Sequence, residues 1–458
     1  MFKYKPLAAA ILALVSIQAL ADDSLSTQTQ SGLENVAEVL QSAATDSTAT
    51  QDQVGEGNNA FADQSAGTGT VLQTQDGDYN ASTGVQSGVT ESSVDHNQTG
   101  EWNGAHSEQW FSENSAANVT QTGSDQQAFS YQDSQISSTI DINQGDQANV
   151  ANAEQVFGEG NTTTINQSGT DNETSTWQVD QIGSTIGIQQ SGTGNIANVD
   201  QTLGQGNQVD VFQTGESGYI EVWQTEQENS QAVVDQDGTL NELVVDQSYG
   251  SGNLATMTQD GNANAAWADQ YESNDSVATV TQTGDSNLSL TYQEGDRLDL
   301  TVNQNGNDNN VFASNWQGAQ EGGQFGSDQV VLLNQTGDGN TANFTQEGNF
   351  NELYFDQTGD DNSLTVSQRD GGNLAEGTSE GIGNIVEVDQ SGSENISQTF
   401  QSAGGDNLAS ITQADVNNFS IVSQVGWGNQ ASVNQSGLNG VSTIDQNGTG
   451  NSATVVQQ

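Results

Sequence analysis

Short segments in which apolar and polar residues alternate recur along most of the chain. Between Asn340 and Gln346, for example, Ala342 and Phe344 alternate with polar neighbours such as Asn343. An alternation with a period of two residues is typical of a β-strand that has one buried face. Similar segments return at short intervals elsewhere, so the pattern predicts many short strands and an all-β fold.

The glutamine that ends each segment returns at a short and regular spacing, as at Gln167, Gln178, Gln190 and Gln201. From Gln86 to Gln293 a shorter and a longer spacing alternate strictly, and the whole series runs from Gln30 to Gln457 with Ser379 in place of one glutamine. The series contains 37 intervals and covers nearly the whole chain. An internal repeat of this kind predicts one long stacked array and argues against several globular domains.

The residues that follow each glutamine have the features of a turn. The pattern is Q-x-G-x-x-N, as from Gln167 to Asn172, and glycine supplies a positive φ at little steric cost. The longer intervals end in a related form that begins with serine, as from Ser184 to Gln190. Two strand types and two turn lengths therefore make one coil, such as the segment from Gln167 to Gln190. The predicted turn glycines are Gly169, Gly192, Gly238, Gly261, Gly337, Gly348 and Gly448.

A coil with two short strands cannot bury its apolar face alone, but stacked coils bury it continuously. The repeat thus predicts a β-solenoid of about 18 stacked two-strand coils, roughly 90 Å long at the usual strand spacing. Each glutamine and asparagine would lie above its equivalent, and side-chain amides, which donate and accept, would form cross-β ladders. The predicted ladder residues are Gln167, Asn172, Gln178, Gln190, Asn195, Gln201, Gln236, Asn241, Gln247, Gln259, Asn264, Gln270, Gln335, Asn340, Gln346, Asn351, Gln357, Gln446, Asn451 and Gln457.

The predicted inward and outward positions of the strands carry different types of residue. All seven tryptophans fall in turns or at outward positions, whereas the inward positions carry Ala, Ser, Thr, Val, Ile and Leu with occasional Phe. A thin core between two sheets has room for small and β-branched residues. Acidic residues also lie mostly in turns or at the outward position before a glutamine, because a buried carboxylate is costly.

The charge of the chain is strongly one-sided, with 60 acidic residues against four basic ones among 458. This balance argues against nucleic acid as a partner, because such binding depends on Lys and Arg that neutralise phosphates. Low hydrophobicity with high net charge favours disorder, but disordered segments are usually rich in proline and lysine, and the chain has neither after Pro6. The single proline, Pro6, fits uninterrupted backbone ladders, and the absence of cysteine excludes disulfides and thiolate metal sites.

Residues 1–21 have the features of a secretory signal peptide. Lys3 and Lys5 precede an apolar run that ends in small residues, and this run is shorter than a membrane span requires. We therefore expect export, cleavage of this leader, and no transmembrane segment in the mature chain. Residues 22–29 would form a short N-terminal segment, and residues 30–458 would form the repeat array.

The repeat is interrupted once. Gln304 is followed by Gln317, and the next step, to Gln335, is longer than any other in the series. A glycine-rich stretch, residues 318–326, lies within this step. We therefore expect a looped insertion at 317–334, either a tolerated surface insertion or a loop that binds a partner.

The combined motif resembles the curlin repeat of curli fibre subunits. Its pattern, Ser-x5-Gln-x-Gly-x-x-Asn-x-Ala-x3-Gln, is complete in Ser184, Gln190, Gly192, Asn195, Ala197 and Gln201. The resemblance implies a structural subunit of an extracellular functional amyloid that self-assembles end to end into a cell-surface fibre for adhesion and biofilm matrix. It also implies a nucleator, a periplasmic chaperone and an outer-membrane export pore as partners. The last coils contain no Lys or Arg, which is similar to a major subunit.

Other chemistries have weaker support in the sequence. His96 and His106 are the only histidines, and neither lies in a zinc motif or beside a plausible nucleophile, so we expect no enzyme, metal site or cofactor. The alternative function is a secreted calcium-binding β-roll adhesin, which is also acidic and repetitive. Its signature would be G-G-x-G-x-D-x-U-x, whereas aspartate is irregular in the turns of this chain.

Overall fold

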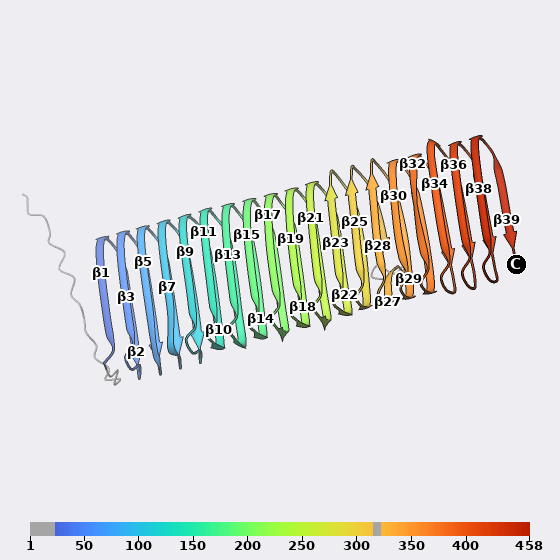
Figure 1. Cartoon of the computed structure of the whole chain (residues 1–458). Helices are drawn as coiled ribbons and strands as arrows, with labels where there is room; N and C mark the ends of the chain where they lie inside the picture. Colours follow the sequence, from blue (N-terminus) through green and yellow to red (C-terminus); the bar gives the residue numbers. More distant parts are fainter. Residues whose placement is uncertain (1–22, 315–321) are drawn as a thin grey trace, which may run out of the picture.

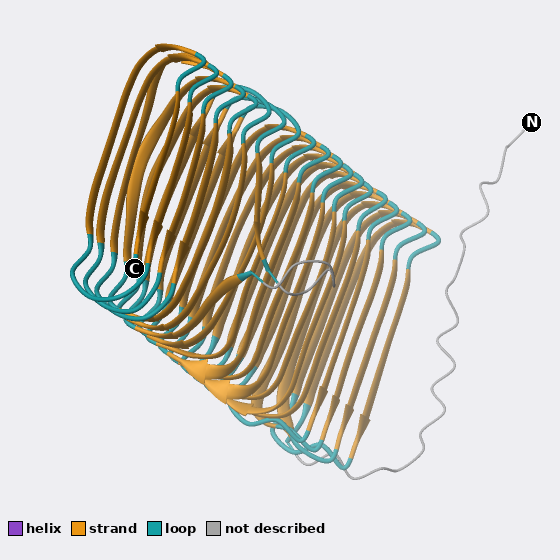
Figure 2. Ribbon diagram, turned by 90° about the vertical axis from the view of Figure 1, so that its right-hand side faces the viewer, coloured by secondary structure: helices purple, strands orange, loops and turns teal. Residues whose placement is uncertain are grey.

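The computed structural model describes residues 23–314 and 322–458, and the predicted leader therefore lies outside the described residues. The described residues contain 39 β-strands, which follow one another along a rod from the N-terminal to the C-terminal end (Figure 1). Successive strands belong to two facing sheets, and the turns gather along the two edges of the rod (Figure 2). The predicted all-β solenoid is therefore confirmed.

The two sheets share the strands in alternation until the insertion near residue 315. The first sheet contains β1 (Leu25–Leu33), β3 (Thr48–Glu56), β5 (Thr68–Asp78), β7 (Thr90–Glu101), β9 (Ala116–Ser124), β11 (Thr139–Gln147), β13 (Thr162–Thr170), β15 (Thr185–Thr193), β17 (Gln208–Glu216), β19 (Gln231–Thr239), β21 (Leu254–Asn262), β23 (Val277–Thr283), β25 (Asp299–Asn305), β28 (Val330–Thr336), β30 (Glu352–Asp360), β32 (Leu374–Ile382), β34 (Ile396–Gly405), β36 (Phe419–Trp427) and β38 (Val441–Thr449). The second sheet contains β2 (Val36–Ser42), β4 (Asn59–Ser65), β6 (Ala81–Ser87), β8 (Gly104–Trp110), β10 (Gln127–Ile136), β12 (Val150–Glu159), β14 (Glu173–Ile182), β16 (Ile196–Gln205), β18 (Tyr219–Glu228), β20 (Glu242–Ser251), β22 (Ala265–Asn274), β24 (Leu288–Asp296), β26 (Asn310–Ala313), β27 (Gly323–Ser327), β29 (Thr341–Asn349), β31 (Ser363–Gly371), β33 (Ile385–Gln390), β35 (Leu408–Gln413), β37 (Gln430–Gln435) and β39 (Ser452–Gln457).

Neighbouring strands within each sheet are parallel and in register. In β13 and β15, Gln167 lies opposite Gln190 and Gly169 lies opposite Gly192. Each strand position in a sheet is called a rung below. The first sheet has 19 rungs, and the solenoid has about 19 turns where the sequence predicts about 18, because the 37 intervals of the series separate 38 strand positions.

The insertion splits one rung of the second sheet. β26 and β27 both pair with β24 on one side and with β29 on the other. Gln324 of β27 continues the glutamine series, whereas Gln317, the residue assigned to that place from the sequence, lies outside the described residues. The expected looped insertion at 317–334 is also too long, because β27 and the first residues of β28 are strand.

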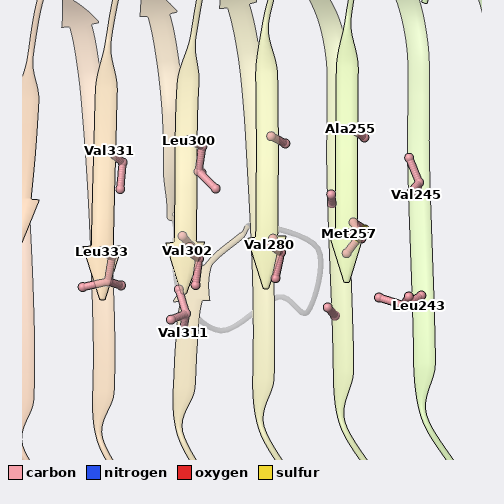
Figure 3. Close-up of a cluster of buried hydrophobic side chains, with 14 of the residues drawn as sticks. Leu243, Val245, Ala255, Met257, Val280, Leu300, Val302, Val311, Val331 and Leu333 are labelled. Carbon is pink, nitrogen blue, oxygen red and sulfur yellow. The ribbon is translucent and has the colours of Figure 1, made fainter. Parts of the chain in front are cut away.

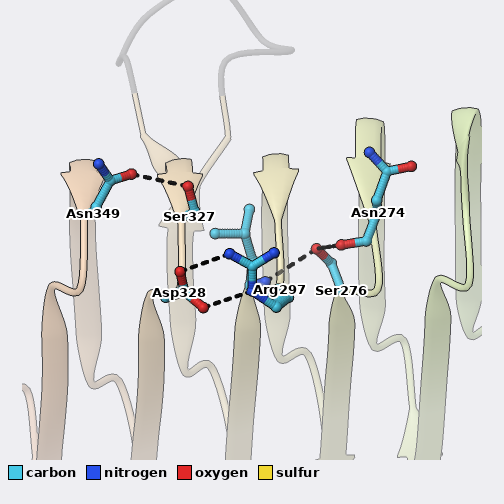
Figure 4. Close-up of polar contacts among 7 residues, drawn as sticks. Asn274, Ser276, Arg297, Ser327, Asp328 and Asn349 are labelled. Carbon is cyan, nitrogen blue, oxygen red and sulfur yellow. Dashed lines mark hydrogen bonds and ion pairs between the residues drawn. The ribbon is translucent and has the colours of Figure 1, made fainter.

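A salt bridge joins the rung that contains the insertion to the rung before it. The guanidinium of Arg297 donates from Nε to Asp328 Oδ1 at 2.7 Å and from its terminal nitrogen to Asp328 Oδ2 at 2.8 Å (Figure 4). A bidentate pair of this kind fixes geometry well, although solvent exposure limits its contribution to stability. The pair helps hold the turn after β27 over the turn after β24.

The core lies between the two sheets and contains mostly small and branched side chains. Figure 3 shows this for Met257, Val280, Leu300 and Leu333, which come from successive rungs of the first sheet, and for Val245 of the second sheet. These five side chains are at most 1% exposed, and the longest continuous cluster of such residues runs from β15 to β33. None of the tryptophans in the described residues is buried, which agrees with their predicted outward or turn positions.

Candidate functional site: the amide ladders and the open ends

Glutamine side chains form a hydrogen-bonded ladder through each sheet. In the second sheet each Nε2 donates to the next Oε1 without a break from Gln41 to Gln457, at 2.7 to 3.0 Å. In the first sheet the ladder runs from Gln30 to Gln357, at 2.7 to 3.1 Å. Ser379 then takes one rung and donates to Gln401 Oε1 at 3.0 Å, and the ladder continues to Gln446.

An amide suits the ladder position because a buried side chain there must both donate and accept a hydrogen bond. Gln190 accepts from Gln167 at 2.9 Å and donates to Gln213 at 2.8 Å, and its Nε2 also donates to the carbonyl of Glu173 at 3.1 Å. The same arrangement places the predicted residues Gln178, Gln201, Gln236, Gln247, Gln259, Gln270, Gln335 and Gln346 in the ladders. Gln357, Gln446 and Gln457 accept from the rung before them.

The asparagines also form amide-to-amide bonds, as from Asn172 Nδ2 to Asn149 Oδ1 at 3.1 Å, and they add bonds to the backbone. The backbone N–H of Asn195 donates to Asn172 Oδ1 at 3.1 Å, while Asn172 Nδ2 donates to the carbonyls of Ser168 at 2.8 Å and Gly192 at 3.2 Å. Each asparagine therefore closes its own turn and ties it to the turn of the next rung. The other predicted asparagines, Asn241, Asn264, Asn340, Asn351 and Asn451, also bond to turn or ladder groups.

The predicted turn glycines have positive φ angles, between 94° and 131° for Gly169, Gly192, Gly238, Gly261, Gly337, Gly348 and Gly448. Away from the two ends of the rod, the turns of successive rungs also stack closely. A Cβ added to Gly192 would lie 2.0 Å from the carbonyl oxygen of Gly215 on the next rung. Glycine is thus required here by both conformation and space.

A second set of buried glutamines was missed by the sequence reasoning. Gln135, Gln181 and Gln227 each lie three residues after a ladder glutamine and are buried near the ends of β10, β14 and β18. The oxygen of Gln181 lies 2.8 Å from Ser184 Oγ. Their fixed offset from the ladder series, and their recurrence in alternate coils, is the signal that could have identified them.

His96 is the one histidine that lies in the core of the described residues. Its ring bonds Ser82 Oγ through Nδ1 at 2.8 Å and Ser107 Oγ through Nε2 at 2.6 Å. Burial lowers the pKa of His96 to about 3, and the second histidine, His106, adds to the decrease. The imidazole is therefore neutral in the folded chain at ordinary pH.

We predict that His96 makes the unassembled chain less stable in mild acid. The unfolded histidine takes up a proton below its ordinary pKa of 6.5, whereas the folded one does so only near 3, so folding loses free energy as pH falls through this window. Between pH 7 and 4.5 the loss attributable to His96 is roughly 2–3 kcal/mol. Denaturant midpoints of the wild type and His96→Gln at both pH values measure it, because Gln73 occupies the same position on the preceding rung.

His106→Gln is the control for this prediction, because His106 is partly exposed and bonds Glu108 on the outer face. The His96→Gln chain should lose less stability on acidification than the wild type, and His106→Gln should not reproduce this difference. Equal pH dependence of wild type and His96→Gln would contradict the assignment.

The two ends of the described solenoid are open. β1 and β2 lack a preceding rung, β38 and β39 lack a following one, and these strands are largely exposed. Apolar side chains stand at both ends, including Leu33 and Val36 at one and Val441 and Val456 at the other. Open strand edges with exposed apolar residues are sites at which another strand can add.

Two kinds of feature are absent from the described residues, namely a cluster of metal ligands and a long apolar helix. Within 23–314 and 322–458, no three Asp, Glu or His side chains converge to hold a metal ion. The same part of the chain has no helix with the length and hydrophobicity needed to cross a membrane. The regular features of the structure are the ladders, the turns and the two ends.

Comparison with known families agrees with this geometry. The curlin associated repeat matches residues 228–261, 250–284 and 337–369, which include ladder residues Gln236, Gln259 and Gln346. No curated protein matches the chain. The repeats and the solenoid fold indicate a structural protein. The chain therefore contains curlin associated repeats.

Proposed function

We propose that the protein is the structural subunit of a curli-like amyloid fibre that grows end to end. The observation that carries this proposal is the match between the two open ends. Because the first sheet has 19 rungs and the second has 19 once β26 and β27 are taken as one, β1 and β2 of one molecule can follow β38 and β39 of another. Each of the two sheets would then run without interruption from one molecule of the fibre into the next.

The ladders give this contact a direction. Gln30 and Gln41 donate toward the interior of their own chain, so their Oε1 acceptors are available at the N-terminal end. Gln446 and Gln457 accept from the preceding rungs, so an Nε2–H remains available at the C-terminal end. The two ends are complementary and not identical, and a head-to-tail contact that does not close produces an open filament. Backbone pairing would add to the amide bonds, as in strand addition.

The curlin repeats also support an extracellular role for such a fibre. We propose that it lies at the cell surface and contributes to adhesion and biofilm matrix. Export would use the leader at residues 1–21, and a nucleator, a periplasmic chaperone and an outer-membrane pore of the curli type would assist it. Acidic side chains on the outside would keep the chain soluble before assembly through like-charge repulsion.

We predict that the C-terminal donors control elongation. Replacing Gln446, Asn451 and Gln457 with alanine should slow seeded growth severalfold, because the terminal ladder groups are removed. Asn451 and Gln457 are already partly exposed, so the unassembled variant should stay folded. Thioflavin fluorescence after addition of wild-type seeds measures elongation, and circular dichroism checks the fold.

The matched control replaces Gln259, Asn264 and Gln270, which occupy equivalent places in the middle of the solenoid. This variant should lose folding stability, and the part that remains folded should elongate at the wild-type rate. End-templated stacking would be rejected if the terminal variant elongated normally.

Electron microscopy and fibre diffraction of the mature chain test the proposal as a whole. The expected result is unbranched fibres with a meridional reflection at roughly 4.8 Å. Soluble monomers whose circular dichroism changes with calcium would instead support the β-roll adhesin.

A further inference from the structure

Carboxylate and aromatic side chains alternate along a line on the outer face of the second sheet. The line occupies the position before each ladder glutamine on β8, β10, β12, β14, β16 and β18. Strand register places its members on successive rungs. They are Glu108, Tyr131, Glu154, Trp177, Asp200 and Trp223, and they are called the outer stripe below.

The outer stripe is accessible along its length. Trp177 is 49% exposed, and the other five members are partly exposed. Because adjacent rungs are separated by about 4.8 Å, successive aromatic rings, like successive carboxylates, are roughly 9–10 Å apart. The solenoid thus presents a row of evenly spaced aromatic rings, with a carboxylate between each ring and the next.

The fold itself does not require this alternation. The equivalent positions on the first sheet, across β9, β11, β13, β15 and β17, carry Thr120, Asn143, Asn166, Gln189 and Phe212. The Asn143 and Asn166 amides there bond each other at 3.0 Å, which continues the polar character of that face. The outer stripe is therefore a property of one face and needs an explanation other than strand formation.

We propose that the outer stripe binds a β-linked amino-sugar polymer with free amino groups, lying parallel to the solenoid axis. Aromatic rings offer flat apolar surfaces and also attract cations through their π faces. Carboxylates accept hydrogen bonds from ammonium and hydroxyl groups. In an extended β-linked chain each pyranose advances by close to one rung, so alternate sugars meet an aromatic ring and those between them meet a carboxylate.

The spacing favours this polymer over a cationic peptide. An extended peptide places side chains on one face at roughly 6.6–6.8 Å, which matches neither one rung nor two. The charge of the chain supports a cationic partner, because 60 acidic residues face only four basic ones. The outer stripe lies on the side of the solenoid, so binding there does not depend on how the ends assemble.

Chitosan oligosaccharides provide the test, with the unassembled full-length chain as the protein. Calorimetric titration should show saturable binding that weakens as salt rises, because ion pairs contribute. Trp177→Ala combined with Trp223→Ala should weaken binding roughly tenfold or more through loss of two ring contacts. Glu154→Gln combined with Asp200→Asn should weaken it similarly and reduce the salt dependence.

Phe212→Ala is the matched control, because Phe212 is an exposed ring at the equivalent position on the first sheet. This variant should bind as the wild type does, and circular dichroism should show all variants folded. Unchanged chitosan binding in either double variant overturns the proposal. Equal affinity for neutral cello-oligosaccharides would overturn the amino-sugar assignment, and tighter binding of oligolysine would assign the stripe to a peptide instead.

Discussion

Replacing Gln190 with glutamate is expected to destabilise the solenoid strongly at neutral pH. Gln190 is buried, accepts from Gln167 at 2.9 Å and donates to Gln213 Oε1 at 2.8 Å. A carboxylate can accept but cannot donate, so it would face the Gln213 oxygen without a hydrogen between them. A buried charge adds its own desolvation cost, and together these effects amount to roughly 4 kcal/mol or more.

The destabilisation by Gln190→Glu should depend on pH in a defined direction. Burial raises the pKa of the introduced carboxyl above its unfolded value of about 4.3. The penalty is fully present above the folded pKa and shrinks as pH falls toward the unfolded value, because the protonated acid donates again. Denaturant midpoints at pH 7 and pH 4, compared with wild type at each pH, measure this recovery.

The adjacent residue provides the control. Gln189 lies on the outer face and is exposed, so Gln189→Glu adds the same charge without burying it and should change stability by less than about 0.5 kcal/mol. Gln190→Ala removes the ladder bonds without adding charge, so its effect should vary less with pH. Similar stability of the two glutamate variants at pH 7 would mean that the ladder is not buried as described.

The sequence predicts the solenoid well because the same local pattern is repeated many times. The period of two residues places Ala342 and Phe344 in the core, and the glutamine series gives the register of most strand pairs. Ser379 was also placed correctly, since it occupies a ladder rung and bonds Gln401. Periodic features of this kind can be recognised without knowing which distant residues are in contact in the folded chain.

The sequence is less informative where a contact depends on three-dimensional packing. After the interruption, spacing alone favours Gln317, but the rung is filled by Gln324 because β26 and β27 share it. The bond from a backbone N–H to Asn172 Oδ1 is also invisible in the pattern, which shows only that asparagine recurs. The outer stripe was missed for the same reason: its members are separated by a full coil of sequence and become neighbours only through strand register.

Replacing Gly192 with alanine is expected to disrupt the stack at one turn. Gly192 has a φ of 109°, which an L-residue rarely adopts, and its new Cβ would lie 2.0 Å from the Gly215 carbonyl oxygen. The obstructing atom belongs to the backbone of the next rung, so no side-chain movement can relieve the clash. We expect a loss of roughly 3 kcal/mol or more, because strain and steric overlap act together.

Gly194→Asn in the same turn separates this clash from a general intolerance of substitution. Gly194 has a φ of 65°, and the nearest atom to an added Cβ is Ser217 Oγ at 3.8 Å. Asp171 and Ser217, which hold the same place on the rungs before and after it, both have a φ of 57°. Asparagine adopts this conformation readily, so Gly194→Asn should change the thermal midpoint little, whereas Gly192→Ala should lower it clearly. If both variants melted at the wild-type temperature, the turn backbones would not be stacked as closely as described. The spacing between rungs that the amide ladders require would then not be maintained at the turns.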